Sequence, residues 1–293
     1  MSELPRVWSI EEFKAGDGYV SKYRRYPALG EAKAEIVFLH GIQSHSGWYE
    51  FSCAELSRQG FGVSFFERRG SGMNEQARGD CPSFRRLLDD VAEFLVTIPR
   101  AVSRATGVAR VPVFLAGISW GGKLAVALER RHPGLVDGLI LLCPGFFPRV
   151  SPSLGQRLRI LASRFFRPRK MFPIPLNDPE LFTATPRWIE FLKTDTRGLR
   201  EATARFLLES VRLDGYLRFA PKYVHVPVLT LLAGQDRIIH NAKTLAFVER
   251  FATPDRQIIE YPDAHHTLEF EPDPRAFLRD LVAWLDRRAG AVA

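Results

Sequence analysis

The segment around Ser119 constrains the possible folds of this 293-residue sequence more than any other part. Residues 111–115 form a short apolar run, residues 116–122 are Ala-Gly-Ile-Ser-Trp-Gly-Gly, and residues 123–131 carry a helical pattern. Strand, G-x-S-x-G turn and helix in this order expose a serine at the edge of a parallel sheet. Only glycine at the two flanking positions lets the strand and the helix approach without Cβ clashes. The segment therefore predicts an α/β fold and makes Ser119 the candidate nucleophile.

Apolar runs and helix-period segments alternate along most of the chain. The predicted strands are residues 35–39, 61–66, 111–115, 138–142 and 226–232, and the predicted helices are residues 48–59, 84–98, 121–131 and 242–251. Strands joined by crossover helices pair in parallel and are covered by helices on both faces. A strand at 256–261, an amphipathic helix at 274–288 and an antiparallel edge of 7–10 with 19–26 complete the prediction.

The alternation of strand and helix patterns stops between residues 147 and 224. Prolines interrupt short helical stretches there, among them Pro148, Pro152, Pro168, Pro173, Pro175, Pro179 and Pro186. We expect residues 1–146 and 225–293 to form one core, with residues 147–224 inserted as a cap, or lid. An insertion at this point lies over the carboxyl ends of the strands, where open α/β sheets bind ligands.

A serine hydroxyl needs a neighbouring base and an orienting acid before it becomes a useful nucleophile at neutral pH. Asp236 follows the strand at 226–232, and a His265-His266 pair follows the next strand, so the order is serine, aspartate, histidine. Asp263 is a rival acid, but its place beside Pro262 favours a role in shaping the turn. Adjacent side chains on a loop usually point in different directions, so one of the two histidines is expected to face Ser119.

An oxyanion hole in this type of fold combines the N–H after the nucleophile with one from the loop after an earlier strand. Trp120 supplies the first N–H, and Ile42, after Gly41, is the candidate for the second. His40 and His45 are better interpreted as hydrogen-bonding residues at the strand end. No cofactor is required, and no metal site is expected, because H-E-x-x-H and C-x-x-C are absent and His132 is isolated.

The net charge of +8 is concentrated in the predicted cap. Residues 147–224 hold 15 Lys and Arg against 7 Asp and Glu, whereas the rest of the chain holds 26 of each. Residues 156–172, QRLRILASRFFRPRKMF, place cations among apolar residues without an acid, a pattern suited to an anionic membrane surface. The alternative is an ordinary cap helix that covers the pocket while its arginines are solvated. Nucleic-acid binding is not expected, because no recognised motif accompanies the charge.

Three features of the sequence bear on the cellular compartment. Residues 1–12 lack the apolar core of a secretory signal, and no stretch is long and apolar enough for a membrane span. Three scattered cysteines, Cys53, Cys81 and Cys143, favour reduced packing residues over a disulfide framework. These signals predict a cytoplasmic protein, with peripheral membrane contact as an addition.

Several blocks together resemble one family. The blocks are His40-Gly41 with His45-Ser46-Gly47-Trp48-Tyr49, Glu67-Arg68-Arg69-Gly70-Ser71-Gly72 in place of Asp-x-Arg-Gly-His-Gly, and residues 115–122, 226–236 and 262–271. They are similar to the monoacylglycerol lipase and lysophospholipase group of α/β-hydrolases, with likeness to the serine aminopeptidase S33-like domain. The resemblance implies an α/β-hydrolase fold and places the catalytic histidine on His266, at the start of a stretch that ends at Glu271. Ile118 and Trp120 replace the family's usual His and Met, and Trp120 is expected to narrow the pocket floor.

The sequence as a whole predicts a serine hydrolase that cleaves a carboxylic ester through an acyl-enzyme on Ser119, with a lipid-like, small-molecule acyl ester as its substrate. Two alternatives remain. An aminopeptidase of the same fold needs an acidic anchor, for which Glu190, Glu201 and Glu209 are candidates. A non-catalytic ligand-binding member would usually have lost one of Ser119, Asp236 and His266.

Overall fold

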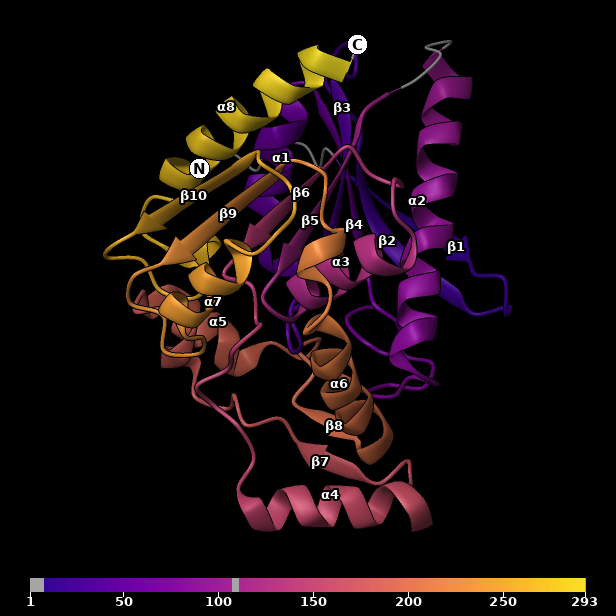
Figure 1. The fold of residues 1–293 in the computed structure, drawn as a ribbon, viewed down its shortest axis with the longest axis vertical. Helices are drawn as coiled ribbons and strands as arrows, with labels where there is room; N and C mark the ends of the chain where they lie inside the picture. The colour runs from indigo at the N-terminus through magenta and orange to yellow at the C-terminus, as the bar shows by residue number, and fades with distance from the viewer. Residues whose placement is uncertain (1–7, 107–110, 293) are drawn as a thin grey trace.

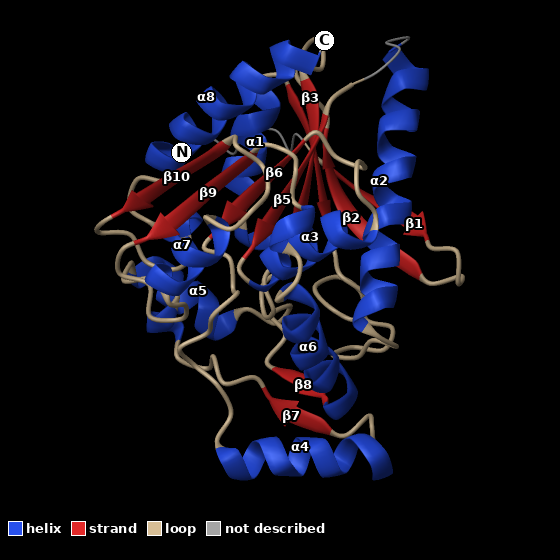
Figure 2. Ribbon diagram, viewed as in Figure 1, coloured by secondary structure: helices blue, strands red, loops and turns tan. Residues whose placement is uncertain are grey.

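An eight-stranded sheet forms the centre of the molecule, and the computed structural model describes residues 8–106 and 111–292 (Figures 1 and 2). The strands are β1 (Ser9–Lys14), β2 (Val20–Tyr26), β3 (Ala34–Leu39), β4 (Phe61–Phe66), β5 (Val113–Ile118), β6 (Gly138–Leu142), β9 (Val228–Ala233) and β10 (Arg256–Tyr261). Their order in the sheet is β1-β2-β4-β3-β5-β6-β9-β10. The six strands from β4 to β10 in this order are parallel, and β1 and β2 form the antiparallel edge. This is an α/β-hydrolase fold, which confirms the predicted fold class.

Helices cover both faces of the sheet. They are α1 (Glu50–Arg58), α2 (Phe84–Thr106), α3 (Trp120–Arg131), α7 (Asn241–Val248) and α8 (Arg275–Val292). The short 3-10 helix η1 (Ser46–Trp48) precedes α1. Side chains along β3 alternate between the faces: Val37 and Leu39 belong to the core with α2 and α3, whereas Ile36 and Phe38 belong to the core with α1 and α8. This two-residue period places every second strand side chain in each of two cores.

Predicted and observed elements differ mainly at their ends. β5 starts at Val113 and not at residue 111, because Pro112 has no N–H to give to the ladder, and it continues to Ile118, which pairs with Leu142. α2 extends to Thr106, past the predicted end at residue 98. β1 reaches Lys14, while Val7 of the predicted edge lies outside the described residues.

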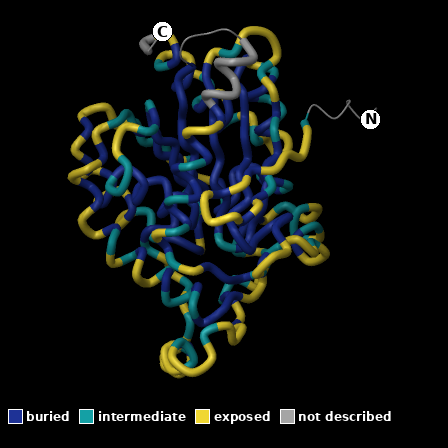
Figure 3. Tube along the Cα trace, turned by 90° about the vertical axis from the view of Figure 1, so that its right-hand side faces the viewer, coloured by how far each residue is buried: buried dark blue, intermediate teal, exposed yellow. Residues whose placement is uncertain are grey.

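Residues 147–224, here named the inserted segment, lie between β6 and β9. Their elements are α4 (Leu154–Phe166), β7 (Met171–Pro173), η2 (Pro179–Leu181), α5 (Pro186–Thr194), β8 (Glu201–Thr203), α6 (Ala204–Leu217) and η3 (Pro221–Tyr223). Figure 1 shows α4, β7, β8 and α6 projecting beyond one end of the sheet, with α4 farthest away. Figure 3 shows this far end as mostly exposed. In the described part of the chain, no helix is both long and apolar enough to cross a membrane.

The sheet reverses its strand order between β3 and β5. From β3 the chain goes through α1 to β4 on one side, and α2 then carries it back to β5 on the other side. α1 and α3 leave β3 and β5 toward opposite faces, and open α/β sheets bind ligands at the carboxyl ends of two such strands. The loops after β3 and β5 carry Gly41-Ile42 and Ser119, so the topology brings these residues together.

Candidate active site

Ser119 occupies a strained turn at the start of α3. Its backbone has φ 50° and ψ −119°, in the region that L side chains rarely adopt. A Cβ on Gly121 would lie 2.2 Å from the carbonyl oxygen of Leu39, and a Cβ on Gly117 would lie 2.6 Å from the Cα of Gly122. Neither position has room for a Cβ, so both must be glycine. This is the reason that the sequence motif predicted.

A chain of hydrogen bonds joins Ser119, His266 and Asp236. Nε2 of His266 lies 2.9 Å from Oγ of Ser119, and Nδ1 lies 2.7 Å from Oδ2 of Asp236. The second carboxylate oxygen of Asp236 accepts hydrogen bonds from the N–H groups of Ile238 at 2.8 Å and Ile239 at 2.9 Å. A carboxylate at Nδ1 fixes the proton on that nitrogen, which leaves Nε2 free to accept the proton of Ser119.

The two rivals to these residues lie elsewhere. His265 turns to Glu271, whose Oε1 accepts from its backbone N–H at 2.7 Å and lies 3.1 Å from its Nδ1. Asp263 is exposed in the turn after β10. The structure thus places His266 and Asp236, and neither His265 nor Asp263, in line with Ser119.

The loop after β3 lies directly against the nucleophile. A Cβ on Gly41 would lie 3.3 Å from Cβ and 3.7 Å from Oγ of Ser119, and the N–H of Gly41 donates to Oγ of Ser44 at 2.8 Å. The next N–H along the loop is that of Ile42, and the first N–H of α3 is that of Trp120. Ile42 lines the same cavity as Ser119, and the N–H of Trp120 lies at the positive end of the α3 dipole, so both predicted oxyanion donors remain candidates for that role.

His40 and His45 hold this loop. Nε2 of His40 accepts from the N–H of Arg68 at 3.0 Å, so its Nδ1 carries the proton and donates to the carbonyl of Gly41 at 2.7 Å. Burial, together with the nearby Arg68, keeps the pKa of His40 well below its usual range. His45 accepts from the N–H of Gly47 at 3.0 Å and pairs with Asp195 at 3.1 Å. Both side chains therefore make structural hydrogen bonds: His40 does so directly after β3, as the sequence predicted, whereas His45 caps η1 and contacts the inserted segment.

Asp195 was not among the predicted site residues. It lies in the inserted segment after α5, and its carboxylate accepts from Nε1 of Trp48 at 2.9 Å in addition to its contact with His45. Although burial opposes ionisation, the hydrogen bond and charge of His45 lower the pKa of Asp195 to about 2. The carbonyl of Gln43 accepts from the N–H of Leu199 at 2.9 Å, so the inserted segment is tied to the oxyanion loop at two points.

A small, mostly apolar cavity of about 10 Å³ adjoins Ser119 and His266. Its lining residues are Gly41, Ile42, Gln43, Ser44, Trp48, Tyr49, Ile118, Ser119, Leu176, Phe182, His266 and Thr267. A space of this size holds about one water molecule. Leu176 and Phe182 come from the inserted segment, so both parts of the chain contribute to the wall.

The side chain of Trp120 has a different position from the one expected. Its Nε1 donates to Oγ of Ser210 at 2.8 Å, and its ring packs against Phe206 at a centroid distance of 5.4 Å. Both partners belong to α6. The indole thus fastens the nucleophile helix to the inserted segment and is not among the described residues that line the cavity beside Ser119.

Cys143, Asp236 and His266 place potential metal-ligand atoms within 4.8 Å of one another. Asp236 and His266 already share a 2.7 Å hydrogen bond, and burial raises the pKa of the Cys143 thiol well above its usual range. An ion at this point would have to displace the proton between Asp236 and His266. The donor set therefore fits the acid and base of a serine hydrolase better than a metal centre.

The fold and these contacts define an α/β-hydrolase. The chain belongs to the serine aminopeptidase S33 family, whose family model matches residues 30–273.

Known proteins with similar sequences and structures include lipases. The chain is 24% identical to an uncharacterized abhydrolase domain-containing protein of Dictyostelium discoideum over 96% of its own length, but it spans only 29% of that relative. It is 24% identical to the monoglyceride lipase of Mus musculus, with 94% of this chain and 89% of the relative covered. A solved structure of a soluble variant of monoglyceride lipase from Saccharomyces cerevisiae, in complex with a substrate analog, matches with a TM-score of 0.82 and 20% identity, covering 98% of this chain and 97% of the other. The chain is thus similar to esterase- and lipase-type hydrolases.

Proposed function

We propose that the protein is a serine hydrolase that cleaves a carboxylic ester of a lipid-like substrate, of monoacylglycerol or lysophospholipid type, through an acyl-enzyme on Ser119. The observation that carries this proposal is the unbroken series of contacts from Ser119 to His266 and from His266 to Asp236. The lipase names among the similar proteins support the substrate class.

The first half of the reaction transfers the acyl group to the serine. Nε2 of His266 takes the proton of the Ser119 hydroxyl as Oγ forms a bond to the carbonyl carbon, and the carbonyl oxygen becomes an oxyanion facing the N–H groups of Ile42 and Trp120. The intermediate collapses, the bond to the leaving oxygen breaks, and His266 returns its proton to that oxygen. Asp236 stabilises the imidazolium throughout.

Water completes the cycle. His266 removes a proton from the water as its oxygen attacks the acyl carbon, and the acid leaves while Ser119 regains its proton. No cofactor takes part in this scheme.

The residues that line the cavity support the proposal of an ester substrate with an apolar acyl group. Ile42, Trp48, Ile118, Leu176 and Phe182 face the space beside Ser119, and none of the described residues that line it is acidic. The candidate anchors for a substrate amine lie elsewhere: Glu190 and Glu201 are exposed, and Glu209 accepts from the N–H of Phe84 and pairs with Arg212. These positions favour an esterase over an aminopeptidase.

The test compares substrates and variants. Purified protein is assayed with p-nitrophenyl esters of short to long chains, a monoacylglycerol, a lysophospholipid and an aminoacyl p-nitroanilide, alongside Ser119→Ala and His266→Ala. We expect ester turnover that falls by about 10,000-fold or more in each variant. Equal ester turnover by the wild type and Ser119→Ala would overturn the mechanism, and turnover of the anilide alone would indicate a peptidase.

We also propose that the inserted segment is a cap over the site. Residues 156–172 of this cap then contact an anionic membrane surface, and the protein is located in the cytoplasm. The apolar side chains of α4 are not used to cover the cavity: Phe165 is 74% and Phe166 is 86% exposed, and only Ile160 is buried. Cations surround them, with no acid between residues 154 and 172. Each cation near an anionic surface contributes on the order of 1 kcal/mol.

Vesicle binding tests this contact. We expect sedimentation with phosphatidylcholine vesicles that contain phosphatidylglycerol, weaker binding in rising salt, and loss of binding in the double variant Phe165→Ser, Phe166→Ser. Leu29→Ser, which removes an apolar side chain of 67% exposure from the β2–β3 loop, is the control. Binding that ignores both salt and anionic lipid would contradict the proposal.

A further inference from the structure

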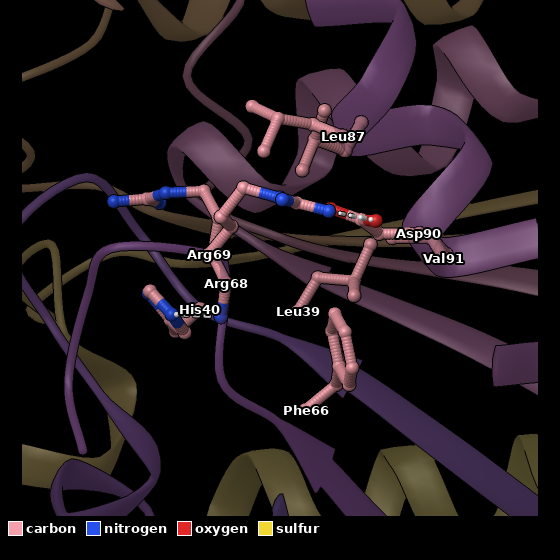
Figure 4. Close-up of a pocket in the computed structure, with 9 residues that line it drawn as sticks. Leu39, His40, Phe66, Arg68, Arg69, Leu87, Asp90 and Val91 are labelled. Atoms are coloured by element: carbon pink, nitrogen blue, oxygen red, sulfur yellow. Dashed lines mark hydrogen bonds and ion pairs between the residues drawn. The ribbon is translucent and has the colours of Figure 1, made fainter. Parts of the chain in front are cut away.

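Arg68 is a fully buried arginine that no carboxylate neutralises in the described part of the chain. It lies in the turn after β4, with 4% of its surface exposed. The neighbouring Arg69 is buried to a similar degree but pairs with Asp90 at 2.7 Å and with Asp17 at 2.9 Å. Figure 4 shows the two side chains extending in opposite directions, with Arg69 reaching Asp90 and Arg68 turned away from it. Burial of an unpaired guanidinium is costly, so its contacts need an explanation.

The guanidinium of Arg68 binds the backbone of the oxyanion loop. Nη1 donates to the carbonyl of Gly41 at 3.1 Å, and Nη2 donates to the carbonyl of Ile42 at 2.9 Å and to Oγ of Ser71 at 3.2 Å. The rings of Trp120 and Phe206 lie 4.8 Å and 5.2 Å from its Cζ. Burial lowers the pKa of Arg68 to about 10, so the side chain remains charged at neutral pH.

The contacted carbonyl of Gly41 belongs to the same peptide group as the N–H of Ile42. In a trans peptide the C=O and N–H point in opposite directions, so a donor that holds the carbonyl of Gly41 turns the N–H of Ile42 away from Arg68. A hydrogen bond to the carbonyl also polarises the peptide and makes its N–H a stronger donor. Gly41 receives a second such bond from Nδ1 of His40 at 2.7 Å.

We propose that Arg68 is a positioning residue for the oxyanion hole: its guanidinium fixes and polarises the peptide between Gly41 and Ile42, so that the Ile42 N–H stabilises the tetrahedral oxyanion. This inference rests on the proposed function of Ser119. It assigns to a buried cation a role in the transition state, where charge develops on the substrate oxygen, and no role in binding the uncharged ester.

The experiment separates that role from support of the fold. Arg68→Met and Arg68→Lys are compared with Arg69→Met, which removes the adjacent arginine and its two ion pairs but no contact to the oxyanion loop. Active sites are counted by labelling Ser119 with a fluorophosphonate to completion. Ester kcat and KM per labelled site are then measured, together with the inhibition constant of a trifluoromethyl ketone, which forms a tetrahedral oxyanion adduct on a nucleophilic serine.

We expect Arg68→Met to lower kcat by about 10- to 100-fold with KM within about threefold of the wild type, and to weaken the ketone by a similar factor. Arg68→Lys keeps the charge but loses the two-pronged contact, so both values should fall between those of the wild type and Arg68→Met. Arg69→Met should lower Tm while kcat per labelled site is unchanged.

Two results would overturn the inference. The first is that Arg68→Met has the same kcat and the same ketone affinity per labelled site as the wild type. If the Met variant does not fold, the same result in Arg68→Lys counts. The other is an equal loss of kcat in Arg69→Met. Failure of the proposed function looks different: the wild-type protein would then show no labelling of Ser119, or Ser119→Ala would retain turnover.

Discussion

Glu129 shows how one side chain sets a pH dependence. It lies on α3 with 2% of its surface exposed, its Oε1 has no hydrogen-bond partner among the described residues, and burial raises its pKa to about 7. Below pH 4.5 the carboxyl is protonated in both the folded and the unfolded chain. Between pH 4.5 and 7 the folded chain holds the proton more tightly, so the free energy of unfolding falls as pH rises.

Replacement of this carboxyl by an amide should remove the fall in the free energy of unfolding that ionisation of Glu129 causes. We expect Glu129→Gln to match the wild type near pH 4 and to be more stable by about 3 kcal/mol at pH 8, since each pKa unit corresponds to about 1.4 kcal/mol. Urea unfolding across this range measures the difference. A difference between the two proteins that does not change with pH would contradict the argument.

Asp195 connects the inserted segment to the loop after β3. Its carboxylate accepts from Trp48 and pairs with His45, and both partners are separated from it by about 150 residues of chain. Because its pKa is lowered to about 2, the stability it contributes is present above the ordinary aspartate pKa near 4 and is lost as pH falls through about 2.

Asp195→Asn should therefore destabilise the protein by about 2 kcal/mol at pH 7, the usual contribution of hydrogen bonds to a charged group. The difference from the wild type should narrow as pH falls from about 4 toward 2. Urea unfolding at pH 7 and pH 3 checks both statements. Glu180→Gln, an exposed change in the same segment, should stay within about 0.5 kcal/mol of the wild type, and an equal effect of the two changes would count against the connection.

The three cysteines report on the integrity of both cores. Cys53 and Cys143 belong to the core with α1 and α8, and Cys81 belongs to the core with α2 and α3. All three are unpaired and no more than 1% exposed, and burial raises the pKa of Cys81 to about 12. A thiol that is both inaccessible and protonated does not react as a nucleophile.

In native buffer, the thiols should react with a thiol-specific disulfide reagent only as fast as the folded protein unfolds enough to expose them. In guanidinium chloride, all three thiols should react at once. Absorbance during reaction under both conditions gives the comparison. Rapid reaction of any thiol in native buffer would show that one of the cores is open.

Local patterns were sufficient for most of the architecture. The strands at 61–66, 138–142 and 256–261 end where the sequence predicted, because buried parallel strands are short apolar runs bounded by turn residues. The two glycines around Ser119 likewise follow from local geometry: each position lacks room for a Cβ. Asp236 and His266 meet Ser119 because the carboxyl ends of parallel strands share one edge of the sheet.

Tertiary structure alone decided the contacts that local patterns do not encode. Trp120 turns to α6 and away from the pocket, since a nearby partner for its N–H and ring exists only after the inserted segment has packed. Arg68 reaches the carbonyls of Gly41 and Ile42 across some 27 residues of chain. Residue type and spacing determine which elements form and which loops share an edge, whereas the direction of a long side chain depends on the neighbours that packing brings to it.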